Sequence, residues 1–194
     1  MHADLAGPFV PSASGGFTYA LVLIDDHTRY KWVYFMRQKS EAPAYMRTFI
    51  SSLNSLLSRR FGADEKMTVA ALHTDNAGEF LSREFVEMLD KDRVSQSTCP
   101  PHVHELNGIA ERAIRTIFSI ARSNLVASGA TPGLWPHLVR HALDVSNRCT
   151  GPTLDVAAAP ESAFQSSFEL FSGKKPKVMA IMSFGCRASA VKPR

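Results

Sequence analysis

Two apolar runs near the N-terminus constrain the fold more than any other feature of the chain. Residues 17–26 (FTYALVLIDD) and 30–37 (YKWVYFMR) are rich in β-branched and aromatic residues and are separated by a short polar stretch. Such runs, so close in sequence, predict two antiparallel strands joined as a hairpin. The first segment, MHADLAGP, is halted by Gly7 and Pro8 and predicts a brief strand beside that hairpin.

After the hairpin the apolar residues change to helical spacing. From Ser40 they recur at steps of three and four residues, which predicts an amphipathic helix. Ser40 is a candidate cap, Pro43 suits the first turn, and the helix is expected to end near Gly62. The apolar positions are Met46, Phe49, Ile50, Leu53, Leu56 and Leu57.

The remaining chain alternates strands and helices. Short strands are predicted at 68–74 and 93–99, with a further one at 181–192. Helices are predicted at 82–92, at 109–127, from the Thr131-Pro132 start signal onward, and around 161–171. This order of elements predicts an α/β domain with a mixed sheet covered by helices.

Size and composition limit the class of protein. The 194 residues, 45% of them hydrophobic, suffice for one sizeable core. No apolar run reaches the roughly 18 residues that a membrane span needs, and the N-terminus lacks the features of a secretory signal. An intracellular protein without a membrane partner is therefore expected. Three widely spaced cysteines, Cys99, Cys149 and Cys186, predict buried thiols rather than disulfides or a zinc site.

Charge is distributed unevenly between the two halves of the chain. Residues 1–100 carry 11 basic and 12 acidic groups, whereas residues 101–194 carry 11 basic and 6 acidic groups. Such an asymmetry fits a surface that binds a polyanion such as nucleic acid. A modest excess of Lys and Arg that only favours solubility explains the same counts, and charge alone does not separate the two interpretations.

The stretch LHTDNAGEF (72–80) places Asp75 directly after a short apolar strand. Asp is an ordinary turn former at strand ends. A carboxylate at the tip of a buried strand is also a candidate ligand for Mg²⁺ or Mn²⁺, and it then needs partner acids from other elements. Asp4 in HADLAGP, Glu111 in NGIAERAIRT, and Asp25 with Asp26 after the second apolar run all qualify by position.

Three blocks together resemble a known family. HADLAGP, LHTDNAGEF and ELNGIAERAIRT are similar to the integrase catalytic core of copia-type long-terminal-repeat retrotransposons, in which two Asp and one Glu bind the metals. The resemblance implies a ribonuclease H-like fold with a mixed five-stranded sheet, in which residues 1–150 form the core and residues 151–194 an extension packed on it. In the family about 35 residues separate the second Asp from the Glu, and 35 residues lie between Asp75 and Glu111.

The resemblance also implies a chemistry. Asp4, Asp75 and Glu111 would bind two Mg²⁺ or Mn²⁺ ions and catalyse 3′-end processing of element DNA and strand transfer into target DNA. A metal-dependent nuclease is a lesser variant of this activity. The implied partners are element ends, target DNA and further copies of the chain. The implied location is the nucleus, with cytoplasmic particles before import.

DNA contacts are expected where the helix that carries Glu111 begins and along its charged side. Asn107 and Gly108 fit a cap, while Arg112, Arg115 and Arg122 are candidates for the DNA backbone. The alternative is that these arginines only form a solvated helix face.

The chain departs from the family pattern in one loop. His104 and Glu105 stand where such integrases usually have Pro-Gln, which adds a negative charge beside the expected DNA phosphate. The sequence also lacks the family's zinc module and C-terminal module, so a core fragment or truncated element is expected. These departures leave open a rival hypothesis, in which a catalytically silent core serves as a DNA-binding or oligomerisation module.

Overall fold

The predicted hairpin forms the first part of the sheet. The computed structural model describes residues 1–61, 68–75, 77–98, 108–149 and 165–186. Within it, β2 (Tyr19–Ile24) and β3 (Lys31–Met36) pair antiparallel, from Tyr19 opposite Met36 to Ile24 opposite Lys31. The high content of β-branched and aromatic residues explains this pairing, because such side chains pack well on a pleated surface.

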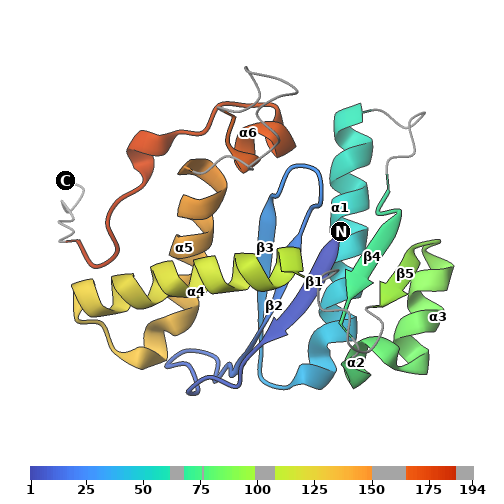
Figure 1. The fold of residues 1–194 in the computed structure, drawn as a ribbon, viewed down its shortest axis with the longest axis horizontal. Helices are drawn as coiled ribbons and strands as arrows, with labels where there is room; N and C mark the ends of the chain where they lie inside the picture. Colours follow the sequence, from blue (N-terminus) through green and yellow to red (C-terminus); the bar gives the residue numbers. More distant parts are fainter. Residues whose placement is uncertain (62–67, 76, 99–107, 150–164, 187–194) are drawn as a thin grey trace, which may run out of the picture.

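The sheet has five strands in the order β3-β2-β1-β4-β5. The short N-terminal strand β1 (His2–Ala6) pairs antiparallel with β2 and parallel with β4 (Ala71–Thr74). The outer strand β5 (Ser95–Thr98) pairs parallel with β4. The predicted mixed five-stranded sheet is therefore confirmed (Figure 1).

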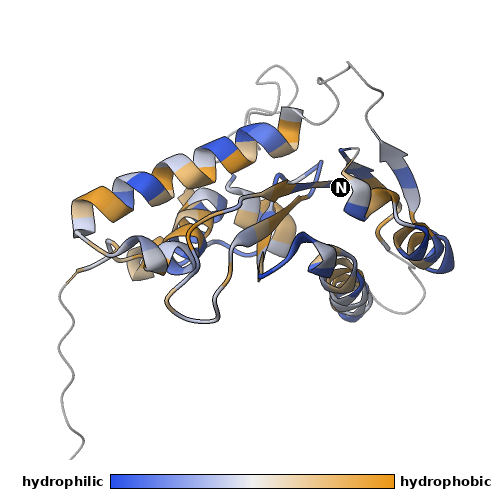
Figure 2. Cartoon of the chain, turned by 90° about the horizontal axis from the view of Figure 1, so that it is seen from below, coloured by the Kyte–Doolittle hydropathy of each residue, from blue (hydrophilic) through white to orange (hydrophobic). Residues whose placement is uncertain are grey.

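Helices cover both faces of the sheet. The long helix α1 (Ala42–Phe61) and the shorter α3 (Arg83–Lys91) pack on one face. On the other face lie α4 (Gly108–Ser128) and α5 (Trp135–Cys149). Figure 2 shows α4 and α1 on opposite sides of the strands. Each face has its own apolar cluster of buried residues, so the domain has two cores separated by the sheet.

Short elements complete the described chain. They are η1 (Lys39–Glu41), α2 (Gly78–Leu81), η3 (Pro132–Leu134), α6 (Ser167–Ser172) and η5 (Val178–Ala180). Aromatic contacts hold α6 against the start of β3, because the Phe171 ring lies 4.6 Å from that of Tyr30 and 5.1 Å from that of Trp32.

Several predicted details are wrong. Ser40 does not cap the first helix, because it lies inside η1, whose capping box is formed by Gln38 and Glu41, with Glu41 accepting from the Gln38 N–H at 3.0 Å. Residues 181–186 of the predicted last strand are not in a strand. They lie against α5 instead, where His141 bonds the Met182 carbonyl at 2.8 Å, while residues 187–192 lie outside the described residues.

The predicted short helix and the cysteines also need correction. The helix begins later than expected, at Ser167, and residues 161–164 lie outside the described chain. Cys149 and Cys186 are exposed free thiols rather than buried ones. Cys99 lies outside the described residues.

Candidate metal-binding catalytic site

The parallel pairing of β1 with β4 directs two aspartates to the same face of the sheet. His2 pairs with His73, and their rings stack with centroids 4.9 Å apart. Asp4 and Asp75 each follow two residues later. Side chains alternate along strands, so continuing the same register brings Asp4 beside Asp75. The neighbours of Asp4, Ala3 and Leu5, belong to the core on the α1 face, so Asp4 is on the α4 face.

The third acid comes from the helix that crosses this face. Glu111 lies in the first turn of α4, and its side chain is exposed. The helix packs against β1 and β2, and its N-terminal end lies over the strands in Figure 1. Ala110 and Ala113 are buried beneath it. These small side chains allow the first turns, and with them Glu111, to approach the sheet closely.

Asp4 responds electrostatically to burial and to the charges of the other two acids. The pKa of Asp4 is raised from 3.8 to about 6, mainly by burial and also by the charges of Asp75 and Glu111, against the lowering effect of a hydrogen bond from the Leu5 N–H. That bond measures 2.7 Å. A group of like charges in a partly desolvated site favours a proton or a cation. The donors are hard carboxylate oxygens, which fit Mg²⁺ and Mn²⁺.

The acids also make local contacts. Asp75 accepts a hydrogen bond from the Ala77 N–H at 3.2 Å, so the turn-forming interpretation of Asp75 holds alongside the ligand hypothesis. Within the described part of the chain, no three or more His, Cys, Asp or Glu side chains are grouped closely enough to hold a metal ion. The convergence of Asp4, Asp75 and Glu111 to metal-sharing distances therefore stays a prediction.

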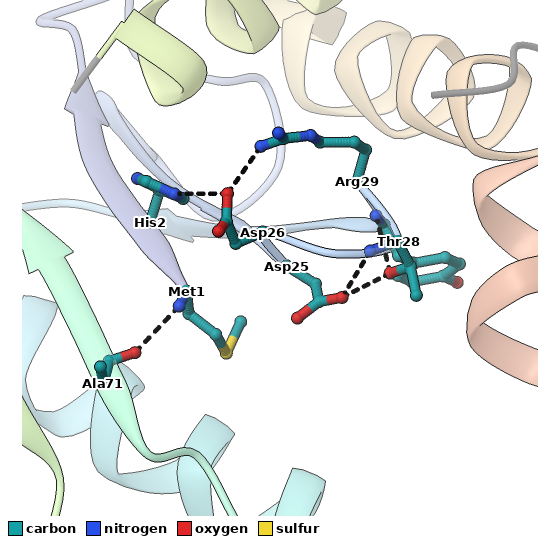
Figure 3. Close-up of polar contacts among 8 residues, drawn as sticks. Met1, His2, Asp25, Asp26, Thr28, Arg29 and Ala71 are labelled. Carbon is teal, nitrogen blue, oxygen red and sulfur yellow. Dashed lines mark hydrogen bonds and ion pairs between the residues drawn. The ribbon is translucent and has the colours of Figure 1, made fainter. Parts of the chain in front are cut away.

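Asp25 and Asp26, which also qualified as metal ligands by position, belong to the hairpin turn instead. Asp25 accepts from the Thr28 N–H at 2.8 Å and from its hydroxyl at 2.7 Å. Asp26 accepts from Arg29 at 2.8 Å and contacts His2 Nε2 at 3.1 Å. Figure 3 shows His2 and Arg29 meeting the same Asp26 oxygen. The sequence did not reveal the contact between His2 and Asp26. The pattern His-x-Asp, which occurs at both Asp4 and Asp75, is a signal that could have shown the pairing of His2 with His73.

The candidate DNA-binding residues are exposed along α4. Arg115 and Arg122 follow Glu111 by four and eleven residues, which places them one and three turns later on the same side of the helix. Arg112 lies over the start of the helix, where its guanidinium would be 3.3 Å from a Cβ at Gly108. The structure thus brings Arg115 and Arg122 to the side of Glu111. Asn107 lies outside the described residues.

A comparison with family models and curated proteins gives consistent matches. A model described as "Integrase core domain" matches residues 1–104. The chain is 29% identical over 194 residues to the retrovirus-related Pol polyprotein from transposon TNT 1-94 of Nicotiana tabacum, covering all of this chain and 13% of that protein. It is 32% identical over 170 residues to that of transposon RE1 of Arabidopsis thaliana, covering 88% of this chain and 10% of that protein. The chain thus spans about a tenth of the length of these relatives.

Solved structures share the fold. The HTLV-2 integrase catalytic core domain in complex with magnesium, in a trimeric form, is 17% identical, with a TM-score of 0.56 over 87% of this chain and 92% of that one. A chain of the simian T-cell lymphotropic virus intasome in complex with PP2A regulatory subunit B56 gamma is 16% identical, with a TM-score of 0.61 over 100% of this chain and 59% of that one. The predicted ribonuclease H-like fold is confirmed.

Proposed function

Because the chain belongs to the integrase core domain family, we propose that it is the catalytic core of a retroelement integrase. In the proposed reaction, water first cleaves a phosphodiester near each element end and leaves a free 3′ hydroxyl. That hydroxyl then attacks a target phosphodiester, forming a new P–O bond while the target strand's own 3′ oxygen leaves. Copia-type Pol polyproteins among the relatives support this assignment.

One observation carries the proposal. The parallel pairing of β1 with β4 sets Asp4 and Asp75 on the face over which α4 brings Glu111. The charges of Asp75 and Glu111 raise the pKa of Asp4 there, although 70 residues separate Asp4 from Asp75 in the sequence. A metal-dependent phosphoryl transferase needs this arrangement, whereas a core that only folds does not.

Asp4, Asp75 and Glu111 would hold two Mg²⁺ or Mn²⁺ ions. When bound, the ions would stabilise the charge that develops on the attacking and leaving oxygens. Arg115 and Arg122, on the Glu111 side of α4, would bind the DNA backbone and orient the strand toward the carboxylates. Arg112, Gly108 and Asn107 would complete the contact where the helix begins.

The proposed partners are element ends, target DNA and further copies of the chain. HTLV-2 integrase cores have been solved in trimeric and dimeric forms, which supports a homo-oligomer here. A reaction on host DNA implies action in the nucleus. Among the described residues, none of the helices combines the length and apolarity that crossing a bilayer requires.

The test compares wild type with Asp75→Asn, which keeps the shape and removes the charge. Asp90→Asn is the matched control, because Asp90 is an exposed acid on α3. Mn²⁺ should raise the melting temperature of wild type and the control but not of Asp75→Asn, and only the first two should cleave or join end-labelled DNA. Undiminished strand transfer by Asp75→Asn would refute the proposal. DNA binding without turnover in every form would favour the silent module.

A further inference from the structure

A lysine outside the carboxylate group lies on the same face of the sheet. Lys31 is the first residue of the edge strand β3. Along this strand Trp32 and Tyr34 pack into the α1-side core, while Val33 and Phe35 pack into the α4-side core. Strand alternation therefore directs Lys31 to the α4 side, which is also the face of Asp4.

The pairing of three strands fixes how far Lys31 lies from the acids. Asp4 is opposite Val22, and Val22 is opposite Val33. Two strand spacings amount to about 10 Å, and the two residues from Val33 back to Lys31 add about 7 Å along the strand. Lys31 therefore lies beyond ion-pair reach of Asp4, at a distance that suits a different phosphate of the same DNA strand.

The buried side-chain amide of Asn147 forms hydrogen bonds with the backbone of Lys31. Asn147 of α5 is 2% exposed. It accepts from the Lys31 N–H at 3.0 Å and donates to the Lys31 carbonyl at 2.9 Å. These two bonds replace the ladder bonds that an edge strand lacks. They fix the position from which the Lys31 side chain extends.

The side chain of Lys31 is half-buried, and none of the described residues pairs it with an opposite charge. Burial, together with a smaller effect of the neighbouring Arg29 charge, lowers the pKa of Lys31 from 10.5 to about 8. In the described part of the chain no carboxylate forms an ion pair with Lys31. Arg29 is paired with Asp26 at 2.8 Å, whereas a partly desolvated ammonium without such a pair favours an added anion.

The turn before Lys31 contains a residue with a strained backbone. Arg29 has a positive φ of 58°, a conformation that usually costs a non-glycine residue about 1 kcal/mol or more. Its side chain extends back beside His2 and Asp26 (Figure 3). Strain of this kind concentrates at functional sites. The turn thus keeps a second cation near Lys31 on the α4 side.

We propose that Lys31, assisted by Arg29, binds a backbone phosphate of the DNA strand that occupies the carboxylate site. This inference rests on the proposed function, which it deepens by adding a contact on the sheet edge to those expected along α4. The phosphate would supply the anion that none of the described residues supplies to the lysine. Contacts at both ends would align the strand over β1 and β2.

The test uses Lys31→Met, which keeps the length of the side chain and removes its charge. Binding to a fluorescent duplex of arbitrary sequence is measured over a salt series in EDTA, so that catalysis does not contribute. The slope of log K against log salt should fall by about one unit, since one phosphate contact is lost. Without DNA, the variant should melt at a higher temperature than wild type, because a half-buried charge without an ion-pair partner among the described residues is gone.

Two further variants serve as controls. Lys31→Arg keeps the charge and should retain the wild-type slope. Lys39→Met removes the same charge from an exposed site just beyond the other end of β3, and it should leave the slope unchanged. An unchanged slope for Lys31→Met, or an equal fall for Lys39→Met, would overturn the inference. A lower melting temperature with an unchanged slope would assign Lys31 a purely structural role.

The same experiment separates this inference from the proposed function. If wild type binds DNA and joins it with metal present while Lys31→Met behaves like the Lys39 control, only the lysine contact is wrong. If wild type binds no DNA at any salt concentration, the proposed function and the lysine contact are both overturned.

Discussion

The two faces of the same strands differ sharply in chemistry. On the α1 face the strands present apolar or aromatic side chains almost without exception: Ala3, Leu5, Leu21, Leu23, Trp32, Tyr34 and Leu72. On the α4 face the same strands carry His2, Asp4, Lys31 and His73 among apolar neighbours, and Asp75 follows. Apolar burial on the α1 face stabilises the fold. On the α4 face, polar groups near one end of α4 reduce that stabilisation.

This comparison predicts that loss of an acid on the α4 face abolishes activity without loss of the fold. Glu111→Gln should lower strand transfer about 10³-fold or more, equivalent to about 4 kcal/mol, because charge stabilisation is usually the largest catalytic contribution. Glu111 is exposed, so the unfolding midpoint should stay near that of wild type. The measurement is a joining assay with end-labelled DNA and Mn²⁺.

The control for Glu111→Gln lies on the other side of the sheet. Glu84→Gln on α3 removes an exposed acid whose side chain is 79% accessible, and it should retain activity. Equal losses in the two variants would show that the assay responds to net charge rather than to the site.

On the α1 face we expect a substitution to lower stability and to leave activity unchanged. Leu23→Ala removes a side chain that is fully buried in the centre of the sheet, and it should lower the free energy of unfolding by about 3 kcal/mol through lost burial and a residual cavity. Activity per folded molecule should remain. Urea denaturation followed by circular dichroism measures the stability, and a change below about 1 kcal/mol would contradict the assignment of this face to the core.

Replacing Asp4 on the α4 face should raise the stability of the metal-free protein rather than lower it. The Asp4 pKa is raised from 3.8 to about 6, so the folded protein binds this proton more tightly than the unfolded chain does. Wild-type stability should therefore fall as the pH rises from about 4 to about 6. Asp4→Asn should remove this loss and make the metal-free protein more stable at neutral pH, by at most about 3 kcal/mol and by less with solvent screening.

Unfolding at several pH values in EDTA checks this expectation for Asp4. The wild type and Asp4→Asn should have similar stability near pH 4 and diverge toward pH 7. If Asp4→Asn is less stable than wild type at pH 7, Asp4 has a structural role that outweighs its electrostatic cost. Asp90→Asn, which changes an exposed acid, should show no such divergence.

Sequence periodicity predicted the two faces only in part. It predicted the hairpin and the order of strands and helices, because strand and helix periods are local signals. It did not predict which residue of β1 lies opposite which residue of β4, since a parallel register depends on distant contacts. The bonds from His2 to Asp26 and from Asn147 to Lys31 escaped prediction for the same reason. The resemblance supplied Asp4, Asp75 and Glu111, which spacing alone would have left among several acids.

The smallest expected effect compares arginines on the two faces. Arg115 lies on α4, one turn after Glu111, whereas Arg59 lies near the end of α1 beyond the other face, and both are exposed. Because phosphate contacts release counterions, Arg115→Ala should reduce the salt dependence of DNA binding by about one unit and weaken binding similarly for all DNA sequences. Arg59→Ala removes the same charge from the chain and should leave that slope unchanged, although it shifts the net charge equally. Affinities measured by fluorescence anisotropy over a salt series decide between a local contact and a general attraction. If the slope of log affinity against log salt falls equally for both variants, DNA responds to the net charge of the protein. The assignment of the α4 face as the DNA-binding face would then be wrong.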